Sequence, residues 1–282
     1  MFAEASNRAA PRYDTFEGVP IGSLAISSLT DVVASIPAGG TVYLGNFGAP
    51  LHCVAHEMIR QRLTGLHVIM GSGGIVLDAL IGAGSVDRIT FAHCWGPIGP
   101  TPAWNFRRSR ETPHPVVQMD EMSLGAMYSA LLGGAWGVAF MPIRGLDQTG
   151  YIGEGWTSSH GVAAAPWGQE TVVRSLAPDL SFVHADRIDR RGNAKVAGPS
   201  ADAALAAQAA RRTVIVAEEI VDRLSDADIA GAHVSQAVVI RGAVRPDGTP
   251  RRYGRDLVAY ERYAEDSQTQ ETFAAWIAQV RR

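Results

Sequence analysis

The sequence has one lysine, two cysteines and no long uninterrupted apolar run. Because Lys195 is the only lysine, arginine supplies 24 of the 25 basic residues. Cys53 and Cys94 are too few for a disulfide framework and lack a metal-binding spacing. The most apolar stretch, 129–143, is broken by glycines and is shorter than the roughly 20 residues needed to cross a bilayer. Residues 1–22 lack the apolar run of a signal peptide, so we expect a cytoplasmic protein with no membrane partner.

The sequence also lacks a large excess of positive or negative charge. The formal net charge is −3, which gives neither a nucleic-acid backbone nor an anionic membrane a long-range field to respond to. We therefore expect no nucleic-acid partner. The arginine excess is compatible with a codon bias or with forked anion-binding side chains, and by itself it indicates no site.

The chain has 282 residues, and 46% of them are hydrophobic. This is enough to bury a core without disulfide bonds or a structural metal. Helical and strand-like patterns alternate, which predicts an α/β fold with an open, largely parallel sheet covered by helices. The periodicity predicts helices over 23–36, 51–63, 75–81, 120–132, 201–210 and 257–282, and strands over 41–44, 66–70, 88–93, 138–142, 171–174, 180–185 and 213–217.

The expected organisation is one domain behind a short extension. Residues 1–22 are interpreted as an N-terminal extension that is mobile or wraps a partner, and residues 23–282 as a single α/β domain. Within it, residues 146–168 are rich in Gly, Ser and Trp and show little periodicity. We expect a long loop or lid there.

Two glycine-rich turns follow predicted strands: Gly45-Asn46-Phe47-Gly48 and Gly71-Ser72-Gly73-Gly74. Backbone N–H groups at such positions can hold an anion or a developing oxyanion. The second turn fails the dinucleotide pattern because position 76 is Val76. Tight turns alone would also explain the glycines, but two of them at neighbouring strand ends favour a ligand crevice.

Three further groups have both a structural and a chemical interpretation. His52 and His56 have a zinc-like spacing but no recognisable third ligand, so we expect no metal. Asp120 and Glu121 stand at a strand–helix junction, either as favourable charges at a helix start or as a partly buried general base. The segment 105–108 is a surface arginine pair or an anion clamp.

Taken in order, these segments resemble the A (α) subunit of family I CoA-transferases, most closely the glutaconate CoA-transferase type. The similarity runs from about residue 24 through nearly the whole chain. It is carried by 43–48, which looks like the family's Gly-Gly-Phe-Gly turn with Asn46 in place of a glycine, and by 73–84, Asn105-Phe106-Arg107-Arg108, Glu121, 137–144, 184–194 and 209–221.

The resemblance implies half of a split active site. It implies that a β-type partner subunit, in a heterodimer or heterotetramer, carries a nucleophilic glutamate that attacks an acyl-CoA thioester. CoA then passes to a second carboxylic acid, and the thioester is the substrate with no bound cofactor. This chain would supply the substrate-binding wall: Gly45, Asn46, Phe47, Gly48, Gly73, Gly74, Asn105, Arg107 and Arg108.

A hydrolytic branch of the same superfamily offers an alternative. Its subunit pairs lack the nucleophilic glutamate and open a carbon ring of a cyclic diketone attached to CoA, and Glu121 looks like their catalytic acid/base. A third possibility is a non-catalytic scaffold that binds acyl-CoA, because fold does not determine function. The transferase is the expected activity.

Overall fold

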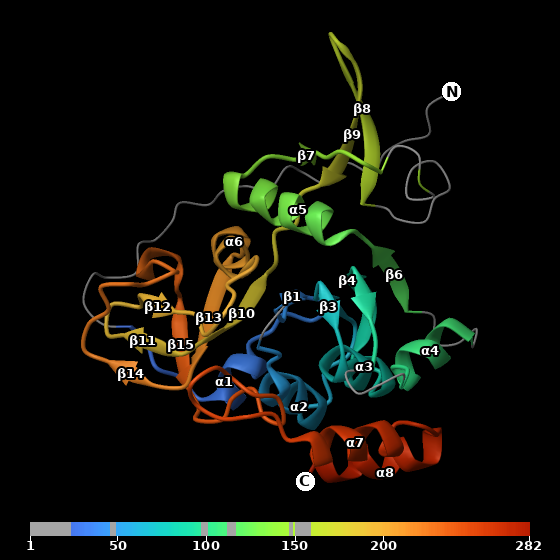
Figure 1. Cartoon of the computed structure of the whole chain (residues 1–282), viewed down its shortest axis with the longest axis vertical. Coiled ribbons are helices and arrows are strands. Elements are labelled where there is room, and N and C mark those ends of the chain that lie inside the picture. Colours follow the sequence, from blue (N-terminus) through green and yellow to red (C-terminus); the bar gives the residue numbers. More distant parts are fainter. Residues whose placement is uncertain (1–23, 46–48, 97–100, 112–116, 147–148, 150–158) are drawn as a thin grey trace.

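The centre of the molecule is a seven-stranded parallel sheet (Figure 1). The computed structural model describes residues 24–45, 49–96, 101–111, 117–146, 149 and 159–282, so the predicted extension 1–22 lies outside the described residues. All neighbouring strands of this sheet pair in parallel. The predicted α/β fold is confirmed. The strand order is β15 (Gln236–Val239), β13 (Arg212–Ala217), β10 (Leu180–Ala185), β1 (Thr41–Tyr43), β2 (Leu66–Ile69), β4 (Val86–Phe91) and β6 (Gln118–Glu121).

Helices cover both faces of this sheet (Figure 1). On one side lie α1 (Leu29–Ala34), α2 (His52–Arg60), α3 (Ile75–Gly82), α7 (Leu257–Asp266) and α8 (Gln270–Val280). On the other lie α5 (Leu124–Trp136) and α6 (Ala203–Ala209), while α4 (Trp104–Glu111) packs beside α3. None of the helices in the described part of the chain is both long and apolar enough to span a membrane.

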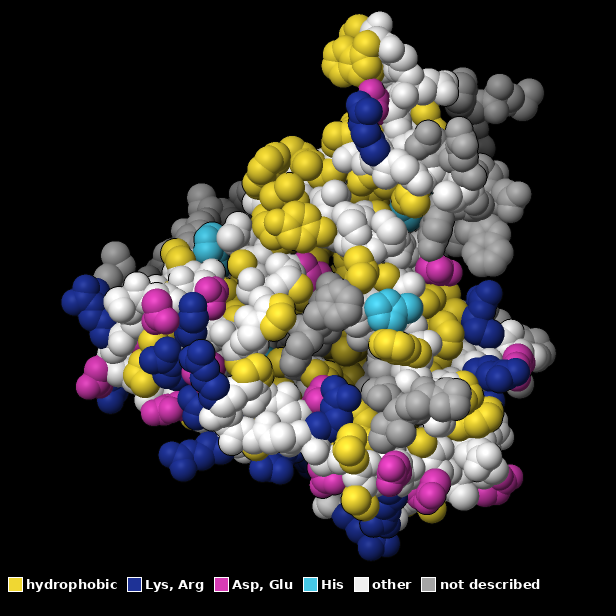
Figure 2. Space-filling view, viewed as in Figure 1, with side chains coloured by type: hydrophobic (Ala, Val, Ile, Leu, Met, Phe, Trp, Pro, Cys, Tyr) yellow, Lys and Arg dark blue, Asp and Glu magenta, His cyan; other side chains and the backbone are white. Residues whose placement is uncertain are grey.

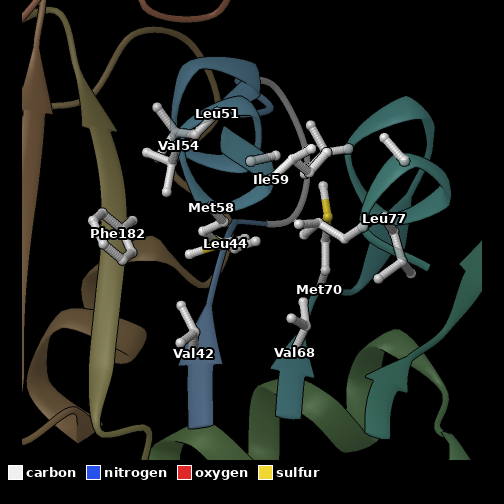
Figure 3. Close-up of a cluster of buried hydrophobic side chains, with 14 of the residues drawn as sticks. Val42, Leu44, Leu51, Val54, Met58, Ile59, Val68, Met70, Leu77 and Phe182 are labelled. Atoms are coloured by element: carbon white, nitrogen blue, oxygen red, sulfur yellow. The ribbon is translucent and has the colours of Figure 1, made fainter. Parts of the chain in front are cut away.

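Alternation along the strands divides the interior into two cores. Val42 and Leu44 of the β1 segment face the first core, where they meet α2 and α3, whereas Tyr43 between them belongs to the second core under α5 and α6. Figure 3 shows the first core, with Val68, Met70 and Phe182 pointing toward α2 together with the β1 side chains. Burial on both faces is the reason most residues of these strands are apolar.

Three small sheets surround the central one. Strands β3 (Ser72–Gly73) and β5 (His93–Cys94) pair beyond the ends of β2 and β4. A second group consists of β11 (Arg187–Asp189), β12 (Ala194–Lys195) and β14 (Ile220–Val221). The third comprises β7 (Phe140–Pro142), β8 (His160–Ala165) and β9 (Gly168–Arg174), and its β8–β9 hairpin projects beyond α5 (Figure 1).

The predicted helix over 120–132 is wrong at its start. Asp120 and Glu121 belong to strand β6, where they pair with Thr90 and Phe91 of β4. The helix begins only after Ser123, whose side chain caps it by accepting a hydrogen bond from the Ala126 N–H at 3.0 Å. Acidic residues are common at helix starts, so the local sequence favoured a helix where an edge pairing produced a strand.

Two terminal helices also differ from prediction. The expected helix 23–36 is confined to Leu29–Ala34, because Ile26 forms a parallel bridge with Ala237 at the sheet edge. The expected single helix 257–282 is two helices, α7 and α8, with Thr269 forming a capping box at the start of α8. Side-chain capping satisfies the free N–H groups of a new helix, so the chain can turn there.

The segment around the third small sheet also differs from prediction. The predicted loop 146–168 contains strand β8, whose alanines and glycine have little intrinsic strand preference and pair only because β9 lies alongside. The predicted buried strand 138–142 is shorter and exposed, with Val138 and Phe140 exposed by 42% and 49%. It lies in the outer sheet beside α5 and not in the central sheet.

Candidate active site

Gly45, the second glycine turn and Glu121 lie at the same end of the central sheet, where its strands have their carboxyl ends. Gly45 follows β1, Gly73 and Gly74 follow β2, and Glu121 ends β6. Because these strands are parallel neighbours, their carboxyl ends share an edge, where open α/β sheets bind ligands. Strands β1 and β6 are three steps apart, which at the usual strand spacing is about 14 Å.

The first glycine turn starts at a cavity. Gly45 has φ +99°, a conformation that requires glycine, while Asn46, Phe47 and Gly48 lie outside the described residues. A cavity of ≈ 30 Å³ adjoins this turn, large enough for a water-sized group. Its polar lining includes Tyr43, His184, Ser200 and Asp202. The hydroxyl of Tyr43 donates to the Asp202 carboxylate at 2.7 Å.

The second glycine turn has a packing role. A Cβ at Gly73 would lie 2.7 Å from Leu77 Cδ2 and 3.1 Å from Cys94 Sγ, so only glycine lets β3 approach β5. Gly74 begins α3 in an extended conformation with no close neighbour at its Cβ position. Anion binding by this turn stays a prediction.

The two neighbouring carboxylates of β6 differ in environment. Asp120 is buried and forms an ion pair with Arg88 of β4. Glu121 is half-buried, in the last position of the outermost strand, and its register partner is Phe91. Asp120 is therefore held by the fold, whereas Glu121 stands at the carboxyl edge with the glycine turns.

The segment Asn105–Arg108 connects helices. Asn105 is buried and its Nδ2 donates to Asp78 Oδ2 at 2.9 Å. Arg108 donates to the carbonyls of Ser267 and Gln268 at 2.8 and 2.9 Å, at the end of α7. Arg107 forms a surface ion pair with Glu111. Substrate binding by Asn105, Arg107 and Arg108 stays a prediction. The hydrogen bonds of Asn105 to Asp78 and of Arg108 to the α7 end already give these two residues a role in helix packing.

Asp78 is the hub of that packing. Its carboxylate is buried and accepts hydrogen bonds from the Asn105 side chain, the Phe106 N–H at 2.8 Å and the Tyr263 hydroxyl at 2.7 Å. Burial raises the pKa of Asp78, with these hydrogen bonds opposing the rise. One side chain of α3 thus ties together α4 and α7.

His52 and His56 are part of an aromatic cluster. The ring of His52 meets those of His56 and Tyr260 edge-on at 6.3 and 6.2 Å, and His56 meets Trp276 at 5.5 Å. Burial lowers the pKa of His52 to about 3, with His56 and Arg255 adding to the effect. Within the described ranges, no three His, Cys, Asp or Glu side chains are grouped to hold a metal ion.

One buried network was missed by sequence reasoning. His184, at the end of β10, contacts Glu218 after β13 with Nε2 and Oε1 at 3.2 Å. Glu218 also accepts from the Gly242 and Ala243 N–H groups and from the Tyr253 hydroxyl. These residues come from three separate segments, so no local spacing could have grouped them.

Comparison with known proteins agrees with this architecture. Residues 26–239 match the model of the family described as coenzyme A transferase. The chain is 30% identical to the A subunit of 3-oxoadipate CoA-transferase from Pseudomonas knackmussii over 245 residues, 85% of this chain and 86% of that protein. It is 24% identical to the A subunit of glutaconate CoA-transferase from Acidaminococcus fermentans over 277 residues, 89% and 86% of the two chains.

Solved structures show the same fold. The crystal structure of glutaconate CoA-transferase from Acidaminococcus fermentans superposes with a TM-score of 0.82 at 22% identity, covering 90% of this chain and 87% of that one. A variant of the decarboxylase AibA/AibB superposes with a TM-score of 0.77 at 25% identity, covering 91% and 99%. The family match spans most of the chain, and one relative reaches 30% identity over most of both sequences. This chain therefore belongs to the coenzyme A transferase family.

Proposed function

We propose that this chain is the α-type half of a two-subunit CoA-transferase that moves CoA from an acyl-CoA to a carboxylic acid. The observation that carries the proposal is the placement of Gly45, Gly73 and Glu121 at the carboxyl end of one parallel sheet, in a chain similar to the A subunits of two CoA-transferases. The substrate is a CoA thioester, and no bound cofactor is required.

The reaction would divide between two chains. A carboxylate of the β-type partner attacks the thioester carbonyl, CoA thiolate leaves, and the resulting anhydride takes back the thiolate to form an enzyme thioester and a free acid. The acceptor acid then reverses these steps. Backbone N–H groups at the glycine turns of this chain would stabilise the oxyanion that forms at each carbonyl. A ligand that reaches from β1 to β6 must be extended, as a CoA thioester is.

An apolar surface supports the need for a partner. Of the twelve large hydrophobic side chains exposed in the described part of the chain, six lie on α5, on the third small sheet or in the turns that follow α5 and join β8 to β9. Figure 2 shows hydrophobic side chains gathered over α5 and at the hairpin tip. So much exposed apolar area on one side is typical of an interaction site. These residues, here called the outer apolar surface, are Tyr128, Trp136, Val138, Phe140, Val162 and Trp167.

Glu121 is proposed to position the substrate or to transfer a proton at the carboxyl end of the sheet. We expect Glu121→Gln to lower turnover of the assembled enzyme by about 10² or more, because an amide neither holds nor accepts the proton. Complex formation and thermal stability should stay close to wild type. Glu261→Gln, which alters an exposed carboxylate on α7, is the control and should keep full turnover. Normal turnover in Glu121→Gln would remove Glu121 from the site.

Activity assays of the assembled enzyme distinguish the transferase from the hydrolase and the scaffold. Incubated with an acyl-CoA and a free acid, a transferase forms a new acyl-CoA, and its partner carries a nucleophilic glutamate. The ring-opening hydrolase, with Glu121 as its catalytic acid/base, would consume a cyclic diketone-CoA with a partner that lacks this glutamate. Binding of acyl-CoA without any conversion would leave the scaffold function. Absence of CoA transfer with every acid and thioester tested would contradict the proposed activity.

A further inference from the structure

The order in which the chain adds strands to the sheet reverses between β1 and β10, next to His184. From β1 the chain builds the sheet outward through β2, β4 and β6, and then returns to add β10, β13 and β15 on the other side. The point between β1 and β10 is therefore the topological switch point, where doubly wound sheets bind ligands. Val42 and Tyr43 pair with Leu180 and Ser181, so the register brings Gly45 next to the residue before His184.

The ≈ 30 Å³ cavity lies at this switch point. It is lined by residues from β1 and the Gly45 turn, from the end of β10 and from the start of α6, including Gly45, His184, Ser200 and Asp202. Most of the lining is apolar, but Tyr43, His184, Ser200 and Asp202 add polar side chains to it, and the volume accommodates one small polar group.

His184 is held by one of its ring nitrogens. Its side chain is 1% exposed, and Nε2 lies 3.2 Å from Glu218 Oε1. Glu218 is itself held by the Gly242 N–H at 2.7 Å, by Ala243 and by the Tyr253 hydroxyl. Burial raises the pKa of Glu218, but these hydrogen bonds outweigh it and keep the carboxylate ionised. An ionised carboxylate accepts hydrogen bonds only, so His184 Nε2 must carry the proton.

The other ring nitrogen, Nδ1, is in a different situation. Nδ1 of His184 is buried and has no hydrogen-bond partner among the residues that the structure describes. Burial lowers the pKa of His184 more than Glu218 raises it, so the imidazole is neutral near pH 7. With the proton on Nε2, Nδ1 presents a lone pair. Buried polar atoms are rarely left without a partner, because each one costs free energy.

We infer that His184, oriented by Glu218, accepts through Nδ1 a hydrogen bond from an N–H or O–H group of the bound CoA thioester at the β1–β10 switch point. The inference rests on the proposed function and assigns it a positioning residue. Tethering of the 241–256 loop explains the Glu218 contacts and the Nε2 hydrogen bond. It does not explain why Nδ1, in a side chain that lines the cavity, has no partner in the described part of the chain.

Two substitutions separate the ring nitrogens. In His184→Gln the amide can still donate to Glu218 but has no acceptor at the Nδ1 position. In His184→Asn the amide oxygen can take the place of Nδ1, but the link to Glu218 is lost. Each complex with the β-type partner is titrated with coenzyme A by calorimetry, and its melting temperature is measured.

We expect His184→Gln to weaken coenzyme A binding by about tenfold or more, because the ligand donor is left buried without a partner. Its melting temperature should stay near wild type. His184→Asn should melt lower and bind coenzyme A more tightly than His184→Gln. Wild-type affinity for coenzyme A in His184→Gln would show that Nδ1 binds a water molecule or nothing. That result would overturn the inference about His184 but not the proposed function.

A measurement on the unaltered protein covers the case in which neither variant folds. With ¹⁵N-histidine in this chain, the His184 Nδ1 resonance of the complex should shift on addition of coenzyme A, as expected when a lone pair gains a hydrogen bond. An unchanged resonance at saturating coenzyme A would overturn the inference. A wild-type complex that neither binds coenzyme A nor turns over any thioester would overturn the proposed function as well.

Discussion

Asn105, Arg107 and Arg108 are neighbours in the sequence, but the fold gives each a different environment. Asn105 is buried against Asp78, Arg108 reaches the carbonyls at the end of α7, and Arg107 lies at the surface. A local motif predicts such residues as a group, whereas their partners lie in α3 and α7, far along the chain. The residue types were identified from the sequence, but their separate contacts depend on how these helices pack.

This difference predicts a contrast between two adjacent arginines. Arg108→Ala should lower the free energy of unfolding by about 1–3 kcal/mol, because the Ser267 and Gln268 carbonyls lose their charged donor. Arg107→Ala should change it by less than about 0.5 kcal/mol, since an exposed ion pair contributes little. Urea denaturation of both variants measures this. Equal stabilities, with a loss of substrate affinity in Arg108→Ala, would instead favour the anion clamp.

His52 predicts an acid-dependent loss of stability. Burial lowers its pKa to about 3 in the folded protein from the ordinary value of 6.5. Between these values the unfolded chain binds a proton that the folded chain does not, so stability is lost as the pH falls from 6.5 toward 3. His52→Leu should reduce the slope of unfolding free energy against pH by about 1.4 kcal/mol per pH unit.

The measurement is a set of denaturation curves between about pH 6 and about pH 4, where one proton accounts for that slope. Burial also lowers the pKa of His67, to about 4, so part of the acid dependence should remain in the variant. The same slope in His52→Leu and in the wild-type protein would mean that His52 is protonated in the fold.

At the scale of elements, α5 depends on two glycines in its last turns. A Cβ at Gly134 would lie 1.9 Å from the Leu176 carbonyl oxygen, and one at Gly133 would lie 2.1 Å from Ser175 Oγ. The segment before β10 thus runs directly against the helix, where it donates a backbone hydrogen bond from Leu176 to Ala130. Glycine costs helix propensity, so its place here reflects close approach.

We therefore expect Gly134→Ala to destabilise the protein by about 2 kcal/mol or more, since the neighbour of its Cβ is backbone. Gly125→Ala in the same helix is the control. Its Cβ would meet nothing closer than 4.0 Å, so it should be neutral or stabilising by up to about 1 kcal/mol. Thermal denaturation compares the two. A stabilised Gly134→Ala would contradict the close approach.

Elements with both faces buried were predictable from sequence, and edge elements were not. The strands around Val42, Val68 and Phe182 are mainly apolar because helices cover both faces of the sheet. Strand β8 and the Asp120–Glu121 part of β6 carry no such signal. Their pairing energy comes from a neighbouring strand, which local periodicity does not register.

At the scale of the whole molecule, the outer apolar surface predicts where the partner docks. Trp136 and Phe140 are exposed by 66% and 49%, and fully desolvated aromatic residues dominate binding energy at interfaces. We expect the double substitution Trp136→Glu and Phe140→Glu to weaken co-purification with the β-type partner by about 100-fold or more. The fold of the isolated chain should be unaffected, as measured by circular dichroism.

Val258→Glu is the matched control for that experiment. Val258 is exposed by 73% on α7, on the opposite side of the sheet from α5 (Figure 1). The added charge there should leave assembly intact. Loss of assembly in the control, or full assembly in the double variant, would place the partner elsewhere on the molecule.

The sequence by itself determined that this is an α/β chain of the coenzyme A transferase family, because periodicity and motif order are local properties that survive without coordinates. Only the tertiary structure decided which residues share a site. Sheet order brings Gly45 and Glu121 to one edge and His184 to Glu218, 34 positions apart. The physical reason is that strand pairing and helix packing bring together residues that are far apart in the sequence. Their spacing along the chain therefore does not indicate which of them are in contact.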